Sequence, residues 1–237
     1  MPYVPRIPRM WGMNLEIIPI DVFSDLVCPW CYVGKRRLEA AISLRPSQRF
    51  AIRWLPFELN PALPVAGMAR AEYMRQRFGD ENRFAAAQQQ LTEIGRGLSI
   101  EFCFSAASWT PNTRRAHSLL QRVAGDGSQA ALELQSRLQE RLMAGHFTHG
   151  ENLSDPDCLI RAATEVGYDA ALARATIDDP DLLAEVVSLE SAAQKAGISG
   201  VPTFIFGGRY AFSGAQEPSA FLEVFDQLAV AAGAAET

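Results

Sequence analysis

The stretch "SDLVCPWCYVGKRR" (residues 24–37) places Cys28 and Cys31 three positions apart, at a point where the sequence pattern changes. Residues 17–23 mix β-branched and aromatic side chains, which is typical of a strand. In residues 38–42, apolar side chains recur at helical spacing. The sequence therefore predicts that Cys28 lies where a strand passes into a helix.

A cysteine at the start of a helix is chemically activated. Unpaired backbone N–H groups and the positive end of the helix dipole gather there, and both stabilise a thiolate relative to a thiol. Pro29 suits the first helical turn because its missing N–H would have no partner there. Trp30 offers an apolar wall without a positive charge, so we expect the helix terminus to carry most of the thiolate stabilisation.

The two-residue spacing allows the second sulfur to fold back onto the first. Cys28 and Cys31 would then open and close a small ring by thiolate attack through a mixed disulfide. We expect Cys28 to be the exposed, attacking sulfur and Cys31 to be the buried, resolving sulfur. The structural alternative, two core cysteines that are neighbours without redox chemistry, stays open at this point.

The other candidate metal ligands are scattered along the chain. A closed structural zinc site needs four ligands, commonly from two close pairs. Cys103 and Cys158 are isolated, and His146 and His149 stand beside glycines in a predicted loop. We therefore predict no metal site, and we expect Cys103 and Cys158 to be inert, buried thiols.

Composition narrows the class of partner. The chain has 237 residues, of which 48% are hydrophobic, enough for one large domain or two small ones. Its formal net charge of -5 argues against a nucleic-acid or anionic-membrane surface, which usually needs an excess of basic residues. The sequence has no uninterrupted run of about 18 apolar residues, so we predict no membrane span. Small molecules or other proteins are the expected partners.

Residues 1–13 contain three prolines and are predicted to form a disordered leader. The short apolar stretch that follows lacks the core and the cleavage site of a signal peptide. We therefore predict a cytoplasmic protein, whose thiols are normally kept reduced by the compartment.

The order of the predicted elements indicates the fold. A second strand (residues 50–55) follows the first helix, and a strand, a two-glycine turn and a strand (residues 201–213) precede a last helix. A long helical stretch separates the two pieces. This order predicts an α/β fold, in which a thioredoxin-like domain (residues 14–62 and 197–232) is interrupted by an α-helical insertion domain (residues 63–196).

Several boundaries within the insertion are also predicted. Residues 99–104 suggest a short extended piece. Ser154 is expected to cap the helix that begins with Pro156 in its first turn. Thr110 or Asn112 is expected to cap an earlier helix that runs to about residue 124. The predicted helices include residues 69–78, 81–96, 128–144, 169–177 and 181–196.

Three longer strings resemble one protein family. They are "DVFSDLVCPWCYVGKRRLE" (residues 21–39), "NTRRAHSL" (residues 112–119) and "GVPTFIFGGRYAFSGAQ" (residues 200–216). All three are similar to the DsbA-type thioredoxin superfamily, and in particular to its FrnE-like cytoplasmic branch. The resemblance covers most of residues 17–228 and is much more specific than an isolated pair of cysteines.

The resemblance implies a client-binding surface beside the dithiol. Val201 and Pro202 would lie against the two sulfurs, with the peptide bond between them cis, and would offer backbone groups to an extended client peptide. Pro29 and Trp30 would border the same surface. Many periplasmic relatives carry histidine inside the motif where this chain has tryptophan, so the resemblance does not imply strong oxidising power.

The sequence thus predicts an enzyme, a protein disulfide oxidoreductase. It would exchange the Cys28–Cys31 dithiol with the thiols of client proteins or small molecules through a mixed disulfide, with disulfide isomerase activity as a variant of the same chemistry. The reaction requires no metal or organic cofactor, and glutathione is a candidate co-substrate. The oligomeric state stays open, a homodimer included.

Two other functions also stay open. The predicted split fold also resembles that of kappa-class glutathione transferases and 2-hydroxychromene-2-carboxylate isomerases, although these typically carry serine at the position of Cys28. In that case Asn112, Arg114 and His117 could face a glutathione cleft, whereas otherwise they belong to an ordinary capped helix. The second alternative is a non-catalytic, peptide-binding chaperone.

Overall fold

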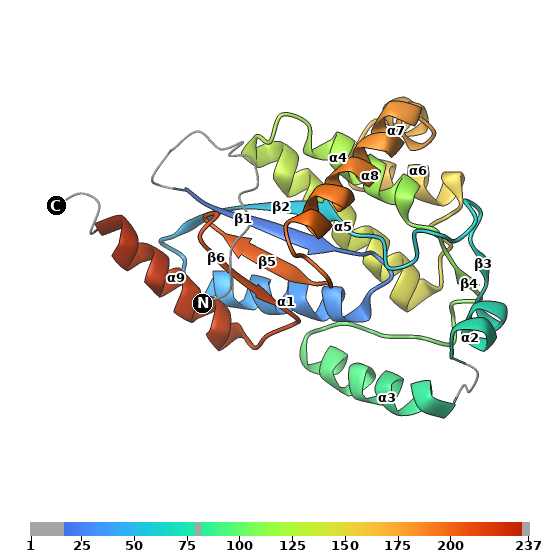
Figure 1. Cartoon of the computed structure of the whole chain (residues 1–237), viewed down its shortest axis with the longest axis horizontal. Helices are drawn as coiled ribbons and strands as arrows, with labels where there is room; N and C mark the ends of the chain where they lie inside the picture. Colours follow the sequence, from blue (N-terminus) through green and yellow to red (C-terminus); the bar gives the residue numbers. More distant parts are fainter. Residues whose placement is uncertain (1–16, 79–81, 234–237) are drawn as a thin grey trace.

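The computed structural model describes residues 17–78 and 82–233, and the predicted leader, residues 1–13, lies outside the described residues. The central sheet has the strand order β2-β1-β5-β6 (Figure 1). β1 and β2 are parallel, β5 runs antiparallel to β1, and β6 runs antiparallel to β5. The four strands are β1 (Ile17–Ser24), β2 (Arg49–Pro56), β5 (Thr203–Phe206) and β6 (Tyr210–Ser213).

Two helices complete the thioredoxin-like part. α1 (Pro29–Ser43) connects β1 to β2, and α9 (Pro218–Gly233) follows β6. Both helices pack on one face of the sheet (Figure 1), where Leu38 of α1 and Phe221 of α9 share an apolar cluster with Phe204 of β5. This order of β-α-β followed by β-β-α is the predicted thioredoxin arrangement.

The remaining elements lie between β2 and β5, as predicted for an interrupted thioredoxin fold. α8 (Pro180–Lys195) covers the second face of the sheet, where its Ala193 joins Phe23 and Ile205 in another cluster. No helix in the described part of the chain is long and apolar enough to cross a membrane. The domain boundaries themselves stay a prediction. The inserted elements are β3 (Met68–Ala69), α2 (Arg70–Phe78), α3 (Asn82–Gly97), β4 (Trp109–Thr110), α4 (Arg114–Ala124), α5 (Gln129–His149), α6 (Pro156–Glu165), α7 (Ala170–Ile177) and α8 (Pro180–Lys195).

Pro19 lies one residue before the β1–β5 ladder, and two glycines form the turn after β5. Pro19 lies in a central strand, where proline is rarely tolerated, but the ladder with β5 begins one residue later, at Ile20 and Phe206. The Pro19 carbonyl accepts the Gly207 N–H at 2.8 Å. Since the N–H and C=O of one strand residue point to the same side, the position of the N–H that Pro19 lacks also lies on this side, beyond the end of β5. Gly207 and Gly208, at φ 57° and 64°, form the predicted turn, which requires this left-handed backbone.

Two predicted boundaries in the insertion are wrong. Residues 99–104 form no strand, and the small sheet of the insertion instead pairs β3 with β4. α5 does not end before His146 but continues through His149. The reason is that Gly150, at φ 68°, provides the left-handed cap that ends the helix.

Two predicted helix caps are also wrong. The N-cap of α6 is Asp155, whose side chain accepts the Asp157 N–H, and not Ser154. The Ser154 hydroxyl instead accepts the backbone N–H of Asn112 at 2.8 Å, which links the loops that precede α6 and α4. The N-cap of α4 is Thr113, although the Asn112 side chain still accepts a backbone N–H from the first turn of α4.

The first turn of α1 belongs to the core of the inserted helices. Cys28, Cys31 and Tyr32 lie in one apolar cluster with Leu119 of α4 and Leu142 of α5. The later turns of α1 pack on the sheet instead. The end of α1 that carries the cysteines therefore packs against the insertion.

Candidate active site

Cys28 stands at the junction of β1 and α1, as predicted. It is the N-cap of α1, with φ -92° and ψ 110°, and Pro29 follows in the first helical turn. The Cys28 N–H donates to the Asp25 carbonyl at 3.2 Å, and the Cys28 carbonyl accepts the Cys31 N–H at 3.0 Å. These contacts hold the Cys28 side chain at the positive end of the helix dipole.

The Cys28 sulfur faces the backbone of Val201. Its Sγ donates to the Val201 carbonyl at 3.9 Å across a separation of 173 positions in the sequence. The prediction that Cys28 is exposed is wrong, because the Val201 segment lies against it and leaves the residue only 5% exposed. Trp30, two residues further on, is 39% exposed.

Cys31 is fully buried, as predicted. Burial raises the pKa of its thiol well above the usual value, and the hydrogen bond and the negative charge of Cys28 raise it further. Hydrogen bonds from the Asp25 backbone and the Ser24 hydroxyl act in the opposite direction. A charge on Cys28 thus suppresses ionisation of Cys31, as expected for two neighbouring sulfurs of one dithiol.

The Val201–Pro202 peptide bond is cis and lies beside α1. A Cβ atom placed on Gly34 would lie 3.1 Å from Pro202 Cγ and 3.1 Å from Phe204 Cζ. The missing side chain of Gly34 therefore allows α1 to approach this segment closely. The structure brings Val201 and Pro202 together with the predicted dithiol stretch, residues 28–31, although the two lie at opposite ends of the fold in sequence.

Most of the chain matches one known family. Residues 19–226 match the model of the DSBA-like thioredoxin domain. The chain belongs to this family. Uncharacterized protein YwbO from Bacillus subtilis (strain 168) is 28% identical over 193 residues, which cover 80% of this chain and 87% of that protein.

Solved structures are similar to this DSBA-like protein over nearly its whole length. A probable DsbA oxidoreductase from Streptomyces coelicolor has a TM-score of 0.76 and 26% identity, with 89% of each chain covered. A 2-hydroxychromene-2-carboxylate isomerase has a TM-score of 0.63 and 15% identity, with 89% of this chain and 96% of that chain covered. The cytosolic disulfide reductase DsbM from Pseudomonas aeruginosa, solved with glutathione, has a TM-score of 0.57 and 19% identity, with 88% and 99% covered. At the two lower identities the likeness shows the fold alone.

A buried acid–base pair lies next to the dithiol of this DSBA-like protein. Asp25 and His117 are 1% and 2% exposed, with 3.4 Å between Asp25 Oδ1 and His117 Nε2. The second oxygen, Oδ2, accepts the Leu59 N–H at 2.7 Å. The pair therefore ties the turn before Cys28 to α4 and to the segment after β2. Asp25 was not predicted as a site residue, although an acid inside the apolar stretch before Cys28 was a usable signal.

The three residues considered for a glutathione cleft have different surroundings. Asn112 and His117 are buried and hydrogen-bonded within the protein. Arg114 pairs with Glu58 at 2.8 Å and lines a cavity of about 210 Å³ with Glu58 and Glu190, whereas Asn112 and His117 do not line it. The structure thus does not bring these three side chains together on one cleft.

Two buried glutamates, Glu58 after β2 and Glu190 of α8, lie next to each other. The Glu58 N–H donates to Glu190 Oε1 at 2.5 Å, and both residues are less than one-tenth exposed. Burial raises the pKa of Glu190 to about 7, and the charge of Glu58 adds to this effect while His117 opposes it. Glu190 is therefore protonated in the folded protein over a pH range in which it is ionised in the unfolded chain.

The raised pKa of Glu190 predicts that the protein loses stability at higher pH. A carboxyl group with a raised pKa stabilises the fold at low pH, and this contribution is lost as the pH rises through about 7. We expect the unfolding free energy of the wild type to fall between about pH 5 and pH 8, and Glu190→Gln to flatten this fall because the amide stays neutral. Thermal unfolding at several pH values measures the effect. Glu185→Gln, on the exposed side of the same helix, is the control, and an equally steep profile in Glu190→Gln would contradict the prediction.

The remaining cysteines differ from each other. Cys158 is buried, as predicted, and its Sγ donates to Glu151 Oε2 at 3.6 Å. Burial and the charge of Glu151 raise the pKa of this thiol to about 12, so it stays protonated and unreactive. The prediction that Cys103 is buried is wrong: the residue is exposed, because Phe102 and Phe104 on either side of it pack inward against Phe147. Within the described residues, no group of His, Cys, Asp and Glu side chains is arranged to hold a metal ion.

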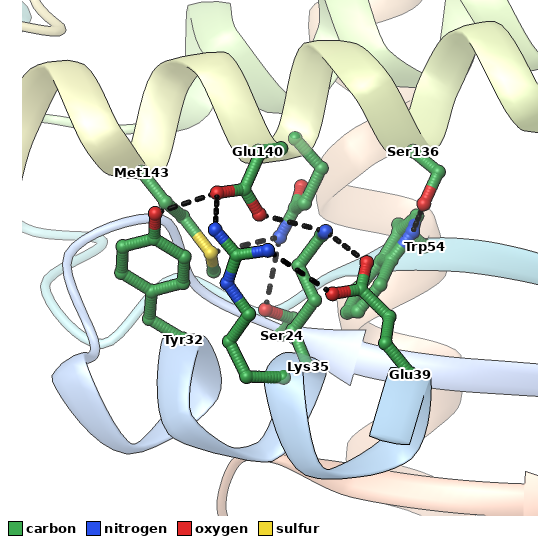
Figure 2. A network of polar contacts seen from close by, with 10 residues as sticks. Ser24, Tyr32, Lys35, Glu39, Trp54, Ser136, Glu140 and Met143 are labelled. Carbon is green, nitrogen blue, oxygen red and sulfur yellow. Dashed lines mark hydrogen bonds and ion pairs between the residues drawn. The ribbon is translucent and has the colours of Figure 1, made fainter. Parts of the chain in front are cut away.

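A network of charges joins α1 to α5 directly after the dithiol. Figure 2 shows Glu140 of α5 above Tyr32 and Lys35 of α1, with Glu39 on the far side of Lys35. Glu140 accepts a hydrogen bond from Tyr32 at 2.6 Å and pairs with Lys35 at 2.7 Å and with Arg36 at 2.6 Å. Lys35 is buried and also pairs with Glu39 at 2.5 Å. This network fixes the inserted helix α5 on the helix that begins with the cysteines.

Proposed function

We propose that the protein is a thiol–disulfide oxidoreductase with Cys28 and Cys31 as its redox couple. The observation that carries the proposal is that two cysteines in different surroundings lie together at the start of one helix. Cys28 lies at the N-cap of α1 against the Val201 carbonyl, and Cys31 is fully buried and responds to the charge of Cys28. Such a pair suits one sulfur for attack on a client and the other for resolution of the product.

The proposed reaction has two exchange steps. In the oxidised enzyme a client thiolate attacks Cys28 Sγ, a bond forms between these two sulfurs, and Cys31 leaves as a thiolate that takes up a proton. The second thiolate of the client then attacks the client sulfur in this mixed disulfide, and Cys28 leaves. The client is oxidised by two electrons and the enzyme is reduced. The reverse sequence makes a reductase, and attack of Cys28 on an incorrect disulfide makes an isomerase.

The client surface is proposed to consist of Trp30 and the Val201–Pro202 segment. Trp30 provides exposed apolar area beside Cys28, and Val201 provides backbone groups next to the sulfur. Client protein thiols are the proposed substrates, with glutathione as a candidate electron partner and no metal or organic cofactor in the reaction. A cytoplasmic location fits this role, because a dithiol near the potential of the glutathione pool could work there in either direction.

The testing experiment is a glutathione redox titration of the purified protein. Alkylation of free thiols and mass spectrometry of the peptide that contains Cys28 and Cys31 report its state at each potential. The proposal expects a reversible two-electron disulfide between the two sulfurs, and the midpoint gives the preferred direction. If the pair never closes but Cys28 holds one glutathione, the activity is a glutathione-dependent transfer or isomerisation, and the proposal fails. If neither sulfur reacts, the protein is a binding protein without redox activity.

A further inference from the structure

The loop between β6 and α9, residues 214–217, passes beside α1 (Figure 1). The Gly214 N–H donates to the Pro202 carbonyl at 2.8 Å, so the loop holds the residue that follows Val201. Gly214 has φ 85°, a left-handed backbone that favours glycine, and its carbonyl accepts the Gln216 N–H at 2.9 Å. The loop is therefore a tight turn with one hydrogen bond to the Val201–Pro202 segment.

Arg37 of α1 anchors this loop. Its Nη1 donates to the Ala215 carbonyl at 2.5 Å, and its guanidinium pairs with Glu217. The Arg37 side chain is only 13% exposed, whereas that of Glu217 is 68% exposed. Since exposed ion pairs contribute little, we expect the shielded, charge-assisted bond to the Ala215 carbonyl to hold the loop.

One face of α1 reaches both the loop and the Val201–Pro202 segment. Gly34 and Arg37 lie three positions apart and so share this face. Gly34 admits Pro202 next to the helix, and Arg37 binds the loop that donates to the Pro202 carbonyl. Val201 and Ala215 both pack against the apolar cluster that contains the dithiol. The helix that begins with the cysteines therefore also holds the segment that lies against them.

We propose that Arg37 is a positioning residue for client binding, which holds the 214–217 loop so that the Val201–Pro202 segment stays in place against Cys28. The inference rests on the proposed oxidoreductase function, in which a client peptide pairs with the backbone of Val201. Arg37 acts through the loop, and Cys28 alone reacts with the client. Loss of the Arg37 hydrogen bond is expected to leave the segment in place for only a fraction of the time.

A client that needs the segment in place should bind Arg37→Met more weakly. This variant keeps the length of the side chain but loses the guanidinium. Single-turnover reduction of the oxidised protein by an excess of a reduced peptide with two cysteines measures the effect. We expect the half-saturating peptide concentration to rise about three- to tenfold, because the apparent affinity falls with the fraction of protein whose segment is in place. The limiting rate should stay within about twofold, since saturating peptide selects that fraction.

A small reagent that needs no docking should respond in the opposite direction. In the reduced protein, the Cys28 thiolate displaces iodide from iodoacetamide and forms a thioether. Because the Val201 segment leaves Cys28 only 5% exposed, we expect alkylation of Cys28 in Arg37→Met to become about three- to tenfold faster. Mass spectrometry of the same digest also reports Cys158, which is buried and is expected to react only when the protein unfolds.

Arg36→Met is the matched control. Arg36 is the neighbouring residue of α1, and it pairs with Glu140 of α5 rather than with the loop. We expect this variant to lower the melting temperature and to leave both readouts at their wild-type values. Arg37→Lys keeps the charge and one donor group, so both readouts should shift by about two- to threefold. If Arg37→Met does not fold, Arg37→Lys decides alone.

An unchanged half-saturating concentration and unchanged alkylation of Cys28 in the Arg37 variants would overturn the proposal. Alkylation of Cys158 that rises together with that of Cys28 would also overturn it, since Arg37 would then support the fold as a whole. If the wild type exchanges no disulfide with the peptide, the proposed oxidoreductase function fails. The alkylation of Cys28 then still decides whether Arg37 holds the segment in place.

Discussion

Cys28→Ser is expected to abolish thiol–disulfide exchange, with the rate falling about a thousandfold or more, because the variant loses the sulfur at the helix start. Cys31→Ser should behave differently. It keeps the attacking sulfur but lacks the resolving one, so disulfides between Cys28 and its client should accumulate. Both outcomes can be read from the rate of disulfide exchange on a reduced or oxidised model peptide and from non-reducing gels.

The matched control is Cys103→Ser. This variant also loses one thiol, and Cys103 is exposed, so it reports whether any accessible thiol contributes to exchange. We expect wild-type rates and no trapped adducts. Equal and undiminished turnover in Cys28→Ser and Cys31→Ser would contradict the roles assigned to the two sulfurs. Exchange that is lost in Cys103→Ser and kept in Cys28→Ser would move the chemistry to the inserted part of the chain.

Glu140→Gln is expected to lower the unfolding free energy by about 2 kcal/mol, because it leaves the buried Lys35 with only one carboxylate partner and weakens the hold on Arg36. Unfolding in urea at neutral pH measures the loss. Glu39→Gln is the matched control, since Glu39 is the other partner of Lys35 but its side chain is 38% exposed. We expect the control to cost about 0.5 kcal/mol or less, as is usual for exposed pairs.

The same network predicts a dependence on acid. Burial by itself would raise the pKa of Glu140, but Lys35, together with Tyr32 and Arg36, holds it below its usual value. The stabilisation is therefore complete above the unfolded value of about 4.3 and is lost as the pH falls through the lower folded value. The difference between the wild type and Glu140→Gln should accordingly shrink below about pH 4. A difference that stays constant through this range would show that the glutamine variant acts by altered packing and not by loss of charge.

The fold could be predicted because its decisive signals are local. The change from strand to helical pattern at Cys28 and the two glycines at 207–208 each report a conformation that neighbouring residues determine. The predictions of the helix caps were wrong because a cap also depends on partners that are distant in sequence. Ser154 has the right chemistry to cap α6, but its hydroxyl accepts the Asn112 N–H from another loop.

Only those parts of the candidate site that are continuous stretches of sequence could be predicted. The dithiol stretch and the Val201–Pro202 segment carry recognisable motifs, and the structure brings them together. Asp25 carries no motif, because its role comes from burial and from partners far away in sequence. The exposure of Cys28 was predicted incorrectly for a related reason, since the segment that lies against it follows the whole insertion.

The pairing of β1 with β5 has a consequence for how the site matures during synthesis. The ribosome releases β1 and the dithiol early, whereas β5 follows only after all inserted helices. Contacts between segments so distant in sequence form late in folding, because a long loop must first close. A newly made chain therefore presents Cys28 without the Val201 segment against it, and pulse alkylation of Cys28 should report the moment at which the nascent protein completes its fold.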